Sequence, residues 1–196
     1  ETPVMDRRLI VSVCAAVGAL AAGVCSAIFS SPLLAVLSGL IGLVAGSVDR
    51  GKLVCAEGDF TSLTWPWLVN GFDVTEVPLA GIADAVDSST TVVAVSVVQS
   101  STGELADLDA VLAAARAHGA LVVLDATQSC GWLPLDASRF DAVVCTGYKW
   151  LCSPRGTAYL ALGEALFEAA RAARGAGRRP PLRRQVIQLF RGKLLQ

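Results

Sequence analysis

The segments LVVLDATQ (residues 121–128) and FDAVVCTGYK (residues 140–149) decide the fold of this chain. Each begins as a run of aliphatic and β-branched residues, which is typical of a buried strand. Each then passes directly into polar residues. Ligands of open α/β sheets bind outside the carboxyl ends of parallel strands. The two segments therefore predict strand ends that bring Asp125 and Lys149, 24 residues apart in the sequence, to one ligand site.

Further elements are expected on both sides of this pair. We predict strands within residues 52–58, 73–79, 90–98 and 156–162, and helices within residues 64–70, 82–88 and 106–118. In the last of these, apolar residues recur on one helical face and Gly119 follows as the expected C-cap. Strands that alternate with helices predict an α/β fold, with a mostly parallel sheet sandwiched by helices in three layers, α/β/α.

Asp125 and Lys149 are the residues whose chemistry needs an explanation. Lysine is rarely buried unless it is paired or used. Burial lowers the pKa of a lysine and leaves a neutral amine that can form a Schiff base. A cofactor with a pyridinium nitrogen needs a carboxylate opposite that nitrogen, and pyridoxal phosphate enzymes combine such an acid with a lysine. On spacing alone, the alternative is that Asp125 caps the next turn and Lys149 extends into solvent.

The sequence LVVLDATQSCGWLPLD…FDAVVCTGYKWLCSPRGTAYL resembles the cofactor-binding core of the class V aminotransferase family, of pyridoxal phosphate fold type I. This family includes cysteine desulfurases, kynureninases and selenocysteine lyase. The D-[AS]-x-Q motif and the [SCT]-x-[HY]-K lysine motif match in order and spacing. SVVQSSTGELADL (96–108) and CAEGDFTSLTWPWL (55–68) resemble two further family segments. The resemblance covers Leu53 to Leu162.

The resemblance implies pyridoxal 5'-phosphate as cofactor and a role for each matched residue. Lys149 would form the Schiff base with the cofactor and then shuttle the α-proton of the substrate. Asp125 would form a salt bridge with the pyridinium nitrogen, and Gln128 would hydrogen-bond the phenolic oxygen. Tyr148 would reach the phosphate.

The resemblance assigns the remaining candidate site residues less directly. Phe60 would stack on the cofactor ring, with a core phenylalanine as the alternative. Thr146 or Cys145 would assist near the lysine. Gln99 and Ser100 lie where relatives often place an asparagine.

The apolar N-terminal part has two mutually exclusive interpretations. From Leu9 to Val48 the chain has 40 consecutive uncharged positions. Leu9–Phe29 is long enough for a membrane span, and buried helices of the α/β domain are the alternative. In the second case, Ser30-Ser31-Pro32 would begin a helix, and Ser31 would belong to a cradle for the cofactor phosphate.

Composition and charge exclude several other classes. The chain is 54% hydrophobic and 17% charged, which argues against disorder, and a net charge of −1 argues against nucleic-acid binding. Its six cysteines and one histidine lack the spacing of a metal site, so we expect no metal. We therefore expect the cysteines to be reduced thiols and the protein to be cytoplasmic.

The C-terminal part is basic, with eight of the 16 basic residues between Arg171 and Lys193. We expect a solvated extension that ends in a short amphipathic helix, QVIQLFRGKLLQ; the alternative is a segment that binds an acidic surface or a membrane. The predicted organisation is an apolar segment with helical character (1–48), a cofactor-binding α/β core (49–165) and a basic extension (166–196).

The predicted function is that of a pyridoxal-phosphate-dependent enzyme of the class V aminotransferase type. It would act on an amino acid by transamination or by Cα/Cβ-bond cleavage. Family members dimerise with the cofactor site near the subunit interface, so the resemblance implies a homodimer. Members are usually longer, and the basic tail does not resemble their C-terminal domain. The alternative is therefore a truncated, non-catalytic remnant, with or without membrane association through residues 9–29.

Overall fold

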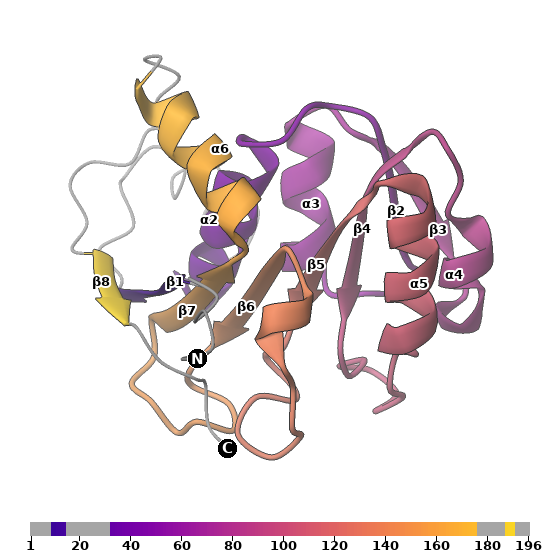
Figure 1. The fold of residues 1–196 in the computed structure, drawn as a ribbon. Coiled ribbons are helices and arrows are strands. Elements are labelled where there is room, and N and C mark those ends of the chain that lie inside the picture. Colours follow the sequence, from indigo (N-terminus) through magenta and orange to yellow (C-terminus); the bar gives the residue numbers. More distant parts are fainter. Residues whose placement is uncertain (1–8, 15–31, 176–186, 191–196) are drawn as a thin grey trace, which may run out of the picture.

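The computed structural model describes residues 9–14, 32–175 and 187–190 (Figure 1). Within these ranges, the strands form one eight-stranded sheet in the order β3-β2-β4-β5-β6-β7-β1-β8. The strands are β1 (Leu9–Cys14), β2 (Lys52–Ala56), β3 (Asp73–Val77), β4 (Thr90–Ser96), β5 (Leu121–Asp125), β6 (Ala142–Thr146), β7 (Thr157–Leu162) and β8 (Ile187–Phe190). The α-helices are α2 (Pro32–Ala45), α3 (Thr61–Val69), α4 (Ile82–Ala85), α5 (Leu108–His118) and α6 (Glu164–Gly175), and the 3₁₀ turns are η1 (Leu79–Gly81) and η2 (Ala137–Arg139).

The sheet has a parallel part and an antiparallel part. Strands β3, β2, β4, β5 and β6 are parallel to their neighbours, as predicted. Strand β7 is antiparallel to β6, because no crossover helix separates the two strands and a loop can join only antiparallel neighbours. Strands β1 and β8 continue the antiparallel part.

Alternate strand residues enter two separate cores, one on each face of the sheet. Leu53 and Cys55 of β2 pack with residues of α2, α3 and α6, whereas Val54 and Ala56 pack with residues of α4 and α5. This is the period of two that a pleated strand imposes. The predicted three-layer α/β/α arrangement is therefore confirmed, and Figure 1 shows the two helical layers.

The helix predicted from the apolar period is confirmed as α5. The side chain of Asp107 accepts a hydrogen bond from Ala110 N at 3.0 Å, so it caps the helix N-terminus. The helix ends at Gly119, whose φ of 72° is the left-handed conformation that glycine adopts most readily.

Two predictions about the ends of the chain are wrong within the described residues. Leu9–Cys14 is a strand rather than the start of a helix, and it pairs along the edge of β7. Ile187–Phe190 is also a strand rather than part of an amphipathic helix, and it pairs with β1. In both segments the pairing of free backbone groups at a sheet edge prevails over the weak local helical pattern.

The segment after Pro32 agrees better with expectation, because α2 begins at Pro32. Its Val36, Ile41 and Val44 side chains are buried against the sheet. No helix in the described part of the chain is long and apolar enough to cross a membrane. The rest of the predicted span up to Phe29 lies outside the described residues.

The order of the strands creates a switch point between β2 and β4. Helix α3, which follows β2, packs on one face of the sheet, and α5, which follows β4, packs on the other. The chain therefore leaves a crevice between the carboxyl ends of these two strands. Ligands of doubly wound sheets bind at such a crevice.

Candidate functional site

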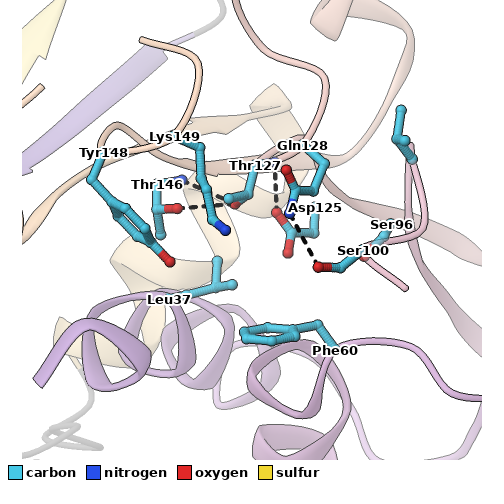
Figure 2. Close-up of a pocket in the computed structure, with 11 residues that line it drawn as sticks. Leu37, Phe60, Ser96, Ser100, Asp125, Thr127, Gln128, Thr146, Tyr148 and Lys149 are labelled. Atoms are coloured by element: carbon cyan, nitrogen blue, oxygen red, sulfur yellow. Dashed lines mark hydrogen bonds between the residues drawn. The ribbon is translucent and has the colours of Figure 1, made fainter. Parts of the chain in front are cut away.

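A pocket opens at this switch point, at the carboxyl ends of β2, β4, β5 and β6 (Figure 2). It is lined by Leu37, Phe60, Ser96, Val98, Ser100, Asp125, Thr127, Gln128, Thr146, Tyr148 and Lys149. Its walls thus combine a carboxylate, an amine and an aromatic ring with several hydroxyl and amide groups. The strand ends supply the polar groups, and α2 and the β2–α3 connection supply Leu37 and Phe60.

Asp125, the last residue of β5, is a buried acid on the floor of this pocket. Its side chain is only 4% exposed, and its Oδ1 accepts a hydrogen bond from Thr127 N at 2.8 Å. Burial raises the pKa of Asp125 to about 6, while the hydrogen bonds from Thr127 act in the opposite direction and the charge of Asp59 raises it further. The carboxylate therefore lacks the stabilisation that a cation would give it.

Thr127 connects the ends of the two central strands. Its Oγ1 accepts a hydrogen bond from Thr146 N at 3.1 Å and lies 3.3 Å from Thr146 Oγ1. Both threonines are buried. Asp125 on β5 is consequently held at a fixed position relative to the loop that follows β6.

Lys149 and Tyr148 come from that loop. Figure 2 shows both side chains directed into the pocket, and Lys149 Nζ lies 5.6 Å from the centroid of the Tyr148 ring. Lys149 is exposed, so the expectation of a buried, desolvated lysine is wrong for this structure. The reason is the geometry of the loop: the strand before Lys149 is buried, but the chain has already left the sheet at Gly147.

Phe60 forms the opposite wall of the pocket and is 37% exposed, so it is not a core residue. The preceding residue, Asp59, fixes its backbone. Asp59 Oδ1 accepts hydrogen bonds from Phe60 N at 2.7 Å and from Ser96 Oγ at 2.5 Å, and Oδ2 accepts from Ser96 N at 2.9 Å and from Gln99 Nε2 at 3.2 Å. One carboxylate thus ties the β2–α3 connection to the end of β4.

Replacing this carboxylate tests whether it positions Phe60. In Asp59→Asn, an NH₂ group replaces one carboxylate oxygen and cannot accept the hydrogen bonds that this oxygen accepted. We therefore expect the loop that carries Phe60 to shift. The affinity for a flat aromatic ligand should fall about tenfold, the equivalent of one lost stacking contact. Quenching of tryptophan fluorescence by added pyridoxal phosphate measures this affinity.

Asp87→Asn is the matched control, because Asp87 also accepts several hydrogen bonds, from Ser89 and Lys52, but in the turn before β4 and away from the pocket. Both variants lose a hydrogen-bonded carboxylate, and only Asp59→Asn should bind the ligand more weakly. Equal losses of affinity in the two variants would show that Asp59 has no positioning role.

Gln128 lies in the turn after β5, held from two sides. Its side-chain Nε2 donates to Ser100 Oγ at 3.1 Å, and its backbone carbonyl oxygen accepts from Trp132 Nε1 at 2.8 Å. The exposed Trp132 ring in turn meets Trp150 edge-on, with 6.0 Å between centroids. The amide of Gln128 is therefore fixed beside Asp125.

Gly147 shows how tightly the lysine loop is packed at its base. A Cβ atom there would lie 2.9 Å from Ser153 Cβ and 3.1 Å from Tyr159 Cε2. We expect Gly147→Ala to lower the free energy of unfolding by about 1–3 kcal/mol, because overpacked sites must move their neighbours. Urea denaturation checks this value. Gly81→Ala, where a Cβ meets nothing within 4 Å, should change it little, and equal effects in both variants would contradict the packing argument.

The structure brings six of the eight predicted site residues into the pocket: Phe60, Asp125, Gln128, Thr146, Tyr148 and Lys149. Gln99 is buried and does not line the pocket; its Nε2 donates to Asp59 Oδ2 at 3.2 Å. Ser31 lies outside the described residues.

Sequence reasoning missed Asp59, Ser96, Thr127 and Leu37. Asp59, Ser96 and Thr127 are polar residues at or just after the ends of predicted strands, and this position is a signal that could have found them. Leu37 carries no such signal, because an apolar residue of a helix is normally a core residue.

The sequence profile of a known family, Aminotransferase class-V, matches residues 70–184, which is more than half of the chain. The chain belongs to this family. The class-V family uses pyridoxal phosphate. The match includes the strand ends that carry Asp125 and Lys149.

Curated relatives agree with this assignment. The chain is 26% identical over 151 residues to isopenicillin N epimerase of Amycolatopsis lactamdurans, which covers 65% of this chain and 38% of the relative. It is 30% identical over 146 residues to a probable cysteine desulfurase of Aeropyrum pernix, which covers 67% of this chain and 35% of the relative. This class-V chain thus spans about a third of the length of these relatives.

The fold is also found among solved structures. A variant of C-DES with glycine covalently linked to its PLP cofactor superposes with a TM-score of 0.60 at 21% identity, and the match covers 68% of this chain and 40% of that chain. C-DES is a cystine C-S lyase. At this identity the likeness establishes the shared fold.

Proposed function

We propose that this class-V chain carries the cofactor site of a pyridoxal-phosphate-dependent enzyme. The enzyme acts on an amino acid through a Schiff base of Lys149, by transamination or by Cα/Cβ-bond cleavage. The main support for this proposal is that Asp125, Phe60 and Lys149 line one pocket at the switch point of the sheet.

The residues of the pocket fit this cofactor. Asp125 is buried, and it takes part in no ion pair found among the described residues, so its raised pKa reports an uncompensated acid. A ring with a basic nitrogen would supply the missing positive charge. Phe60 offers a flat wall for such a ring, and Lys149 offers an amine for an aldehyde. The solved C-DES variant, which shares the fold, holds PLP.

The bound cofactor supplies an electron sink for the bond-breaking step. The protein side chains hold it and move protons. Asp125 accepts the ring N–H and keeps that proton in place, and Gln128 donates its amide hydrogen to the ring oxygen. Lys149 Nζ takes the α-proton of the substrate and returns it as a general acid. Tyr148 donates its hydroxyl hydrogen to the phosphate.

The assembly and location of the protein follow from the same proposal. We propose a homodimer, and the exposed Trp132 and Trp150 side chains supply apolar surface for a subunit contact near the pocket. The described cysteines are free thiols, which supports a location in a reducing compartment such as the cytoplasm.

Titration of the purified chain with pyridoxal phosphate tests the proposed function. We expect saturable binding with a new absorption band near ~420 nm, which is typical of this cofactor bound to a lysine. The absence of the band at saturating cofactor would contradict the proposal, and the chain would then be a non-catalytic member of its family.

A further inference from the structure

A second cavity is lined by residues of the turn after β5 and of β6 and β7, and two of its lining residues are cysteines. Cys130 and Cys145 line this cavity together with the apolar side chains of Val143, Leu133 and Ala161, among others. Cys130 belongs to the turn after β5, and Cys145 is the penultimate residue of β6. The proposed cofactor chemistry uses neither thiol.

Backbone hydrogen bonds hold the two cysteines next to each other. Ala126 N donates to Val144 O at 2.7 Å, which fixes the turn against the residue before Cys145. Cys130 N donates to Ala126 O at 2.7 Å, which places Cys130 one turn further along the same segment. The two side chains therefore reach the same cavity from adjacent segments, and Cys145 Sγ donates to Thr146 O at 3.4 Å.

The surroundings of the two thiols give them different reactivities. The neighbouring Cys130 thiol raises the pKa of the Cys145 thiol, and burial and the charge of Asp125 add to this effect. The neighbouring Cys145 thiol lowers the pKa of Cys130, although burial opposes the change. Cys130 is also the more accessible of the two. Since thiolates are the reactive form, Cys130 is the nucleophile of the pair.

Cys55 and Cys152, two further cysteines whose side chains the structure describes, lack this arrangement. Cys55 is buried, and burial raises its pKa to about 12, so it is unreactive. Cys152 is exposed, and its Sγ lies 3.8 Å from Trp150 O rather than beside another sulfur. Among the cysteines whose side chains the structure describes, Cys130 and Cys145 line one cavity together.

We propose that Cys130 and Cys145 form an oxidation site that reacts with peroxides and closes to an intrachain disulfide. The Cys130 thiolate attacks one oxygen of the peroxide, the O–O bond breaks, and hydroxide leaves, which gives a sulfenic acid at Cys130. The Cys145 sulfur then attacks Cys130 Sγ. The S–O bond breaks, and the oxygen leaves as water with the proton of Cys145.

The electrons and protons of these two reaction steps balance. The two thiols lose two electrons and two protons, and hydrogen peroxide is reduced to two molecules of water.

The disulfide would connect the two segments that form the cofactor pocket. Cys130 follows Gln128 by two positions, and Cys145 immediately precedes Thr146. The oxidation chemistry itself does not depend on bound cofactor, so it can be tested whether or not the proposed function holds.

The test uses the full chain as the Cys152→Ser variant, which removes a solvent-exposed thiol. The protein is treated with equimolar hydrogen peroxide, remaining thiols are alkylated, and peptides are mapped by mass spectrometry. We expect a linked Cys130–Cys145 peptide that disappears after reduction. Alkylation of both cysteines after peroxide, or linkage to one of the other cysteines, would overturn the proposal.

Two further variants separate the formation of the sulfenic acid from the formation of the disulfide. In Cys145→Ala, oxidation should stop at the sulfenic acid, so dimedone should label Cys130 several-fold more than in the parent protein. In Cys130→Ala, Cys145 should stay reduced. Preferential labelling of Cys145 would overturn the assignment of Cys130 as the nucleophile.

Discussion

The Lys149→Ala variant should show no absorption band near ~420 nm at any concentration of pyridoxal phosphate, and borohydride should trap no cofactor on it. This is the largest effect that we expect from a single substitution, because the alanine has no amine to bond the aldehyde. Lys149 lines the pocket that also contains Asp125 and Phe60. Turnover of any amino acid should fall by about 10²–10⁴-fold or more, which is the usual contribution of a positioned acid–base group.

Lys52→Ala is the control for this experiment. Lys52 is a lysine of β2 whose Nζ lies 2.7 Å from Asp87 Oδ2 and 3.1 Å from Ala85 O, so it is engaged away from the pocket. We expect this variant to keep the band. A band that persists in Lys149→Ala and vanishes in Lys52→Ala would mean that the wrong lysine has been assigned.

The Asp125→Asn variant should have opposite effects on binding and on stability. The amide cannot hold the proton of a pyridinium nitrogen, so the affinity for cofactor should fall by roughly 10²-fold, or about 3 kcal/mol, as when one partner of a buried ion pair is removed. The cofactor-free protein should instead become more stable near neutral pH. A buried uncompensated carboxylate disappears, and the amide oxygen can still accept the hydrogen bond from Thr127 N.

The pH dependence of stability follows from the raised pKa of Asp125. Its pKa is about 6 in the folded protein and about 3.8 in the unfolded chain. Between these values the folded state keeps a proton that the unfolded state has lost, so this residue's contribution to stability declines as pH rises through this window. The shift corresponds to about 3 kcal/mol as an order of magnitude. Asp125→Asn should therefore match the parent protein near pH 4 and exceed it above pH 6.

Urea denaturation of the cofactor-free protein at several pH values measures this difference. Asp107→Asn is the matched control, because asparagine caps a helix about as well as aspartate and Asp107 does not line the pocket. It should show no such dependence on pH. A constant difference between Asp125→Asn and the parent protein from pH 4 to pH 8 would contradict the description of Asp125 as a buried, uncompensated acid.

The central fold was predictable because its signals are local and strong. The runs 90–96, 121–125 and 142–146 are continuous and apolar, as strands buried on both faces must be. The ends of the chain were not predictable in the same way. LIVSVC and IQLF are short apolar segments that suit either a helix or a strand, and the free edge of β7 decides between them.

The site was predictable where a residue type and a strand end coincide, as at Asp125 and Lys149. Contacts between segments that are distant in sequence were not. Asp59 bonds Ser96 across 37 positions, and no local pattern reveals this contact. The exposure of Lys149 was misjudged for a related reason, since the burial of a strand says nothing about the loop that follows it.

Peptide mapping after borohydride reduction tests the central claim most directly. The sequence contains three lysines, Lys52, Lys149 and Lys193, so the site of attachment can be read without ambiguity. The chain is saturated with pyridoxal phosphate, reduced, digested and analysed by mass spectrometry. We predict the pyridoxyl group on the peptide that contains Lys149, in an amount close to one per chain. Attachment to Lys52 or Lys193, or an even distribution over the three lysines, would contradict the assignment of this pocket as the cofactor site.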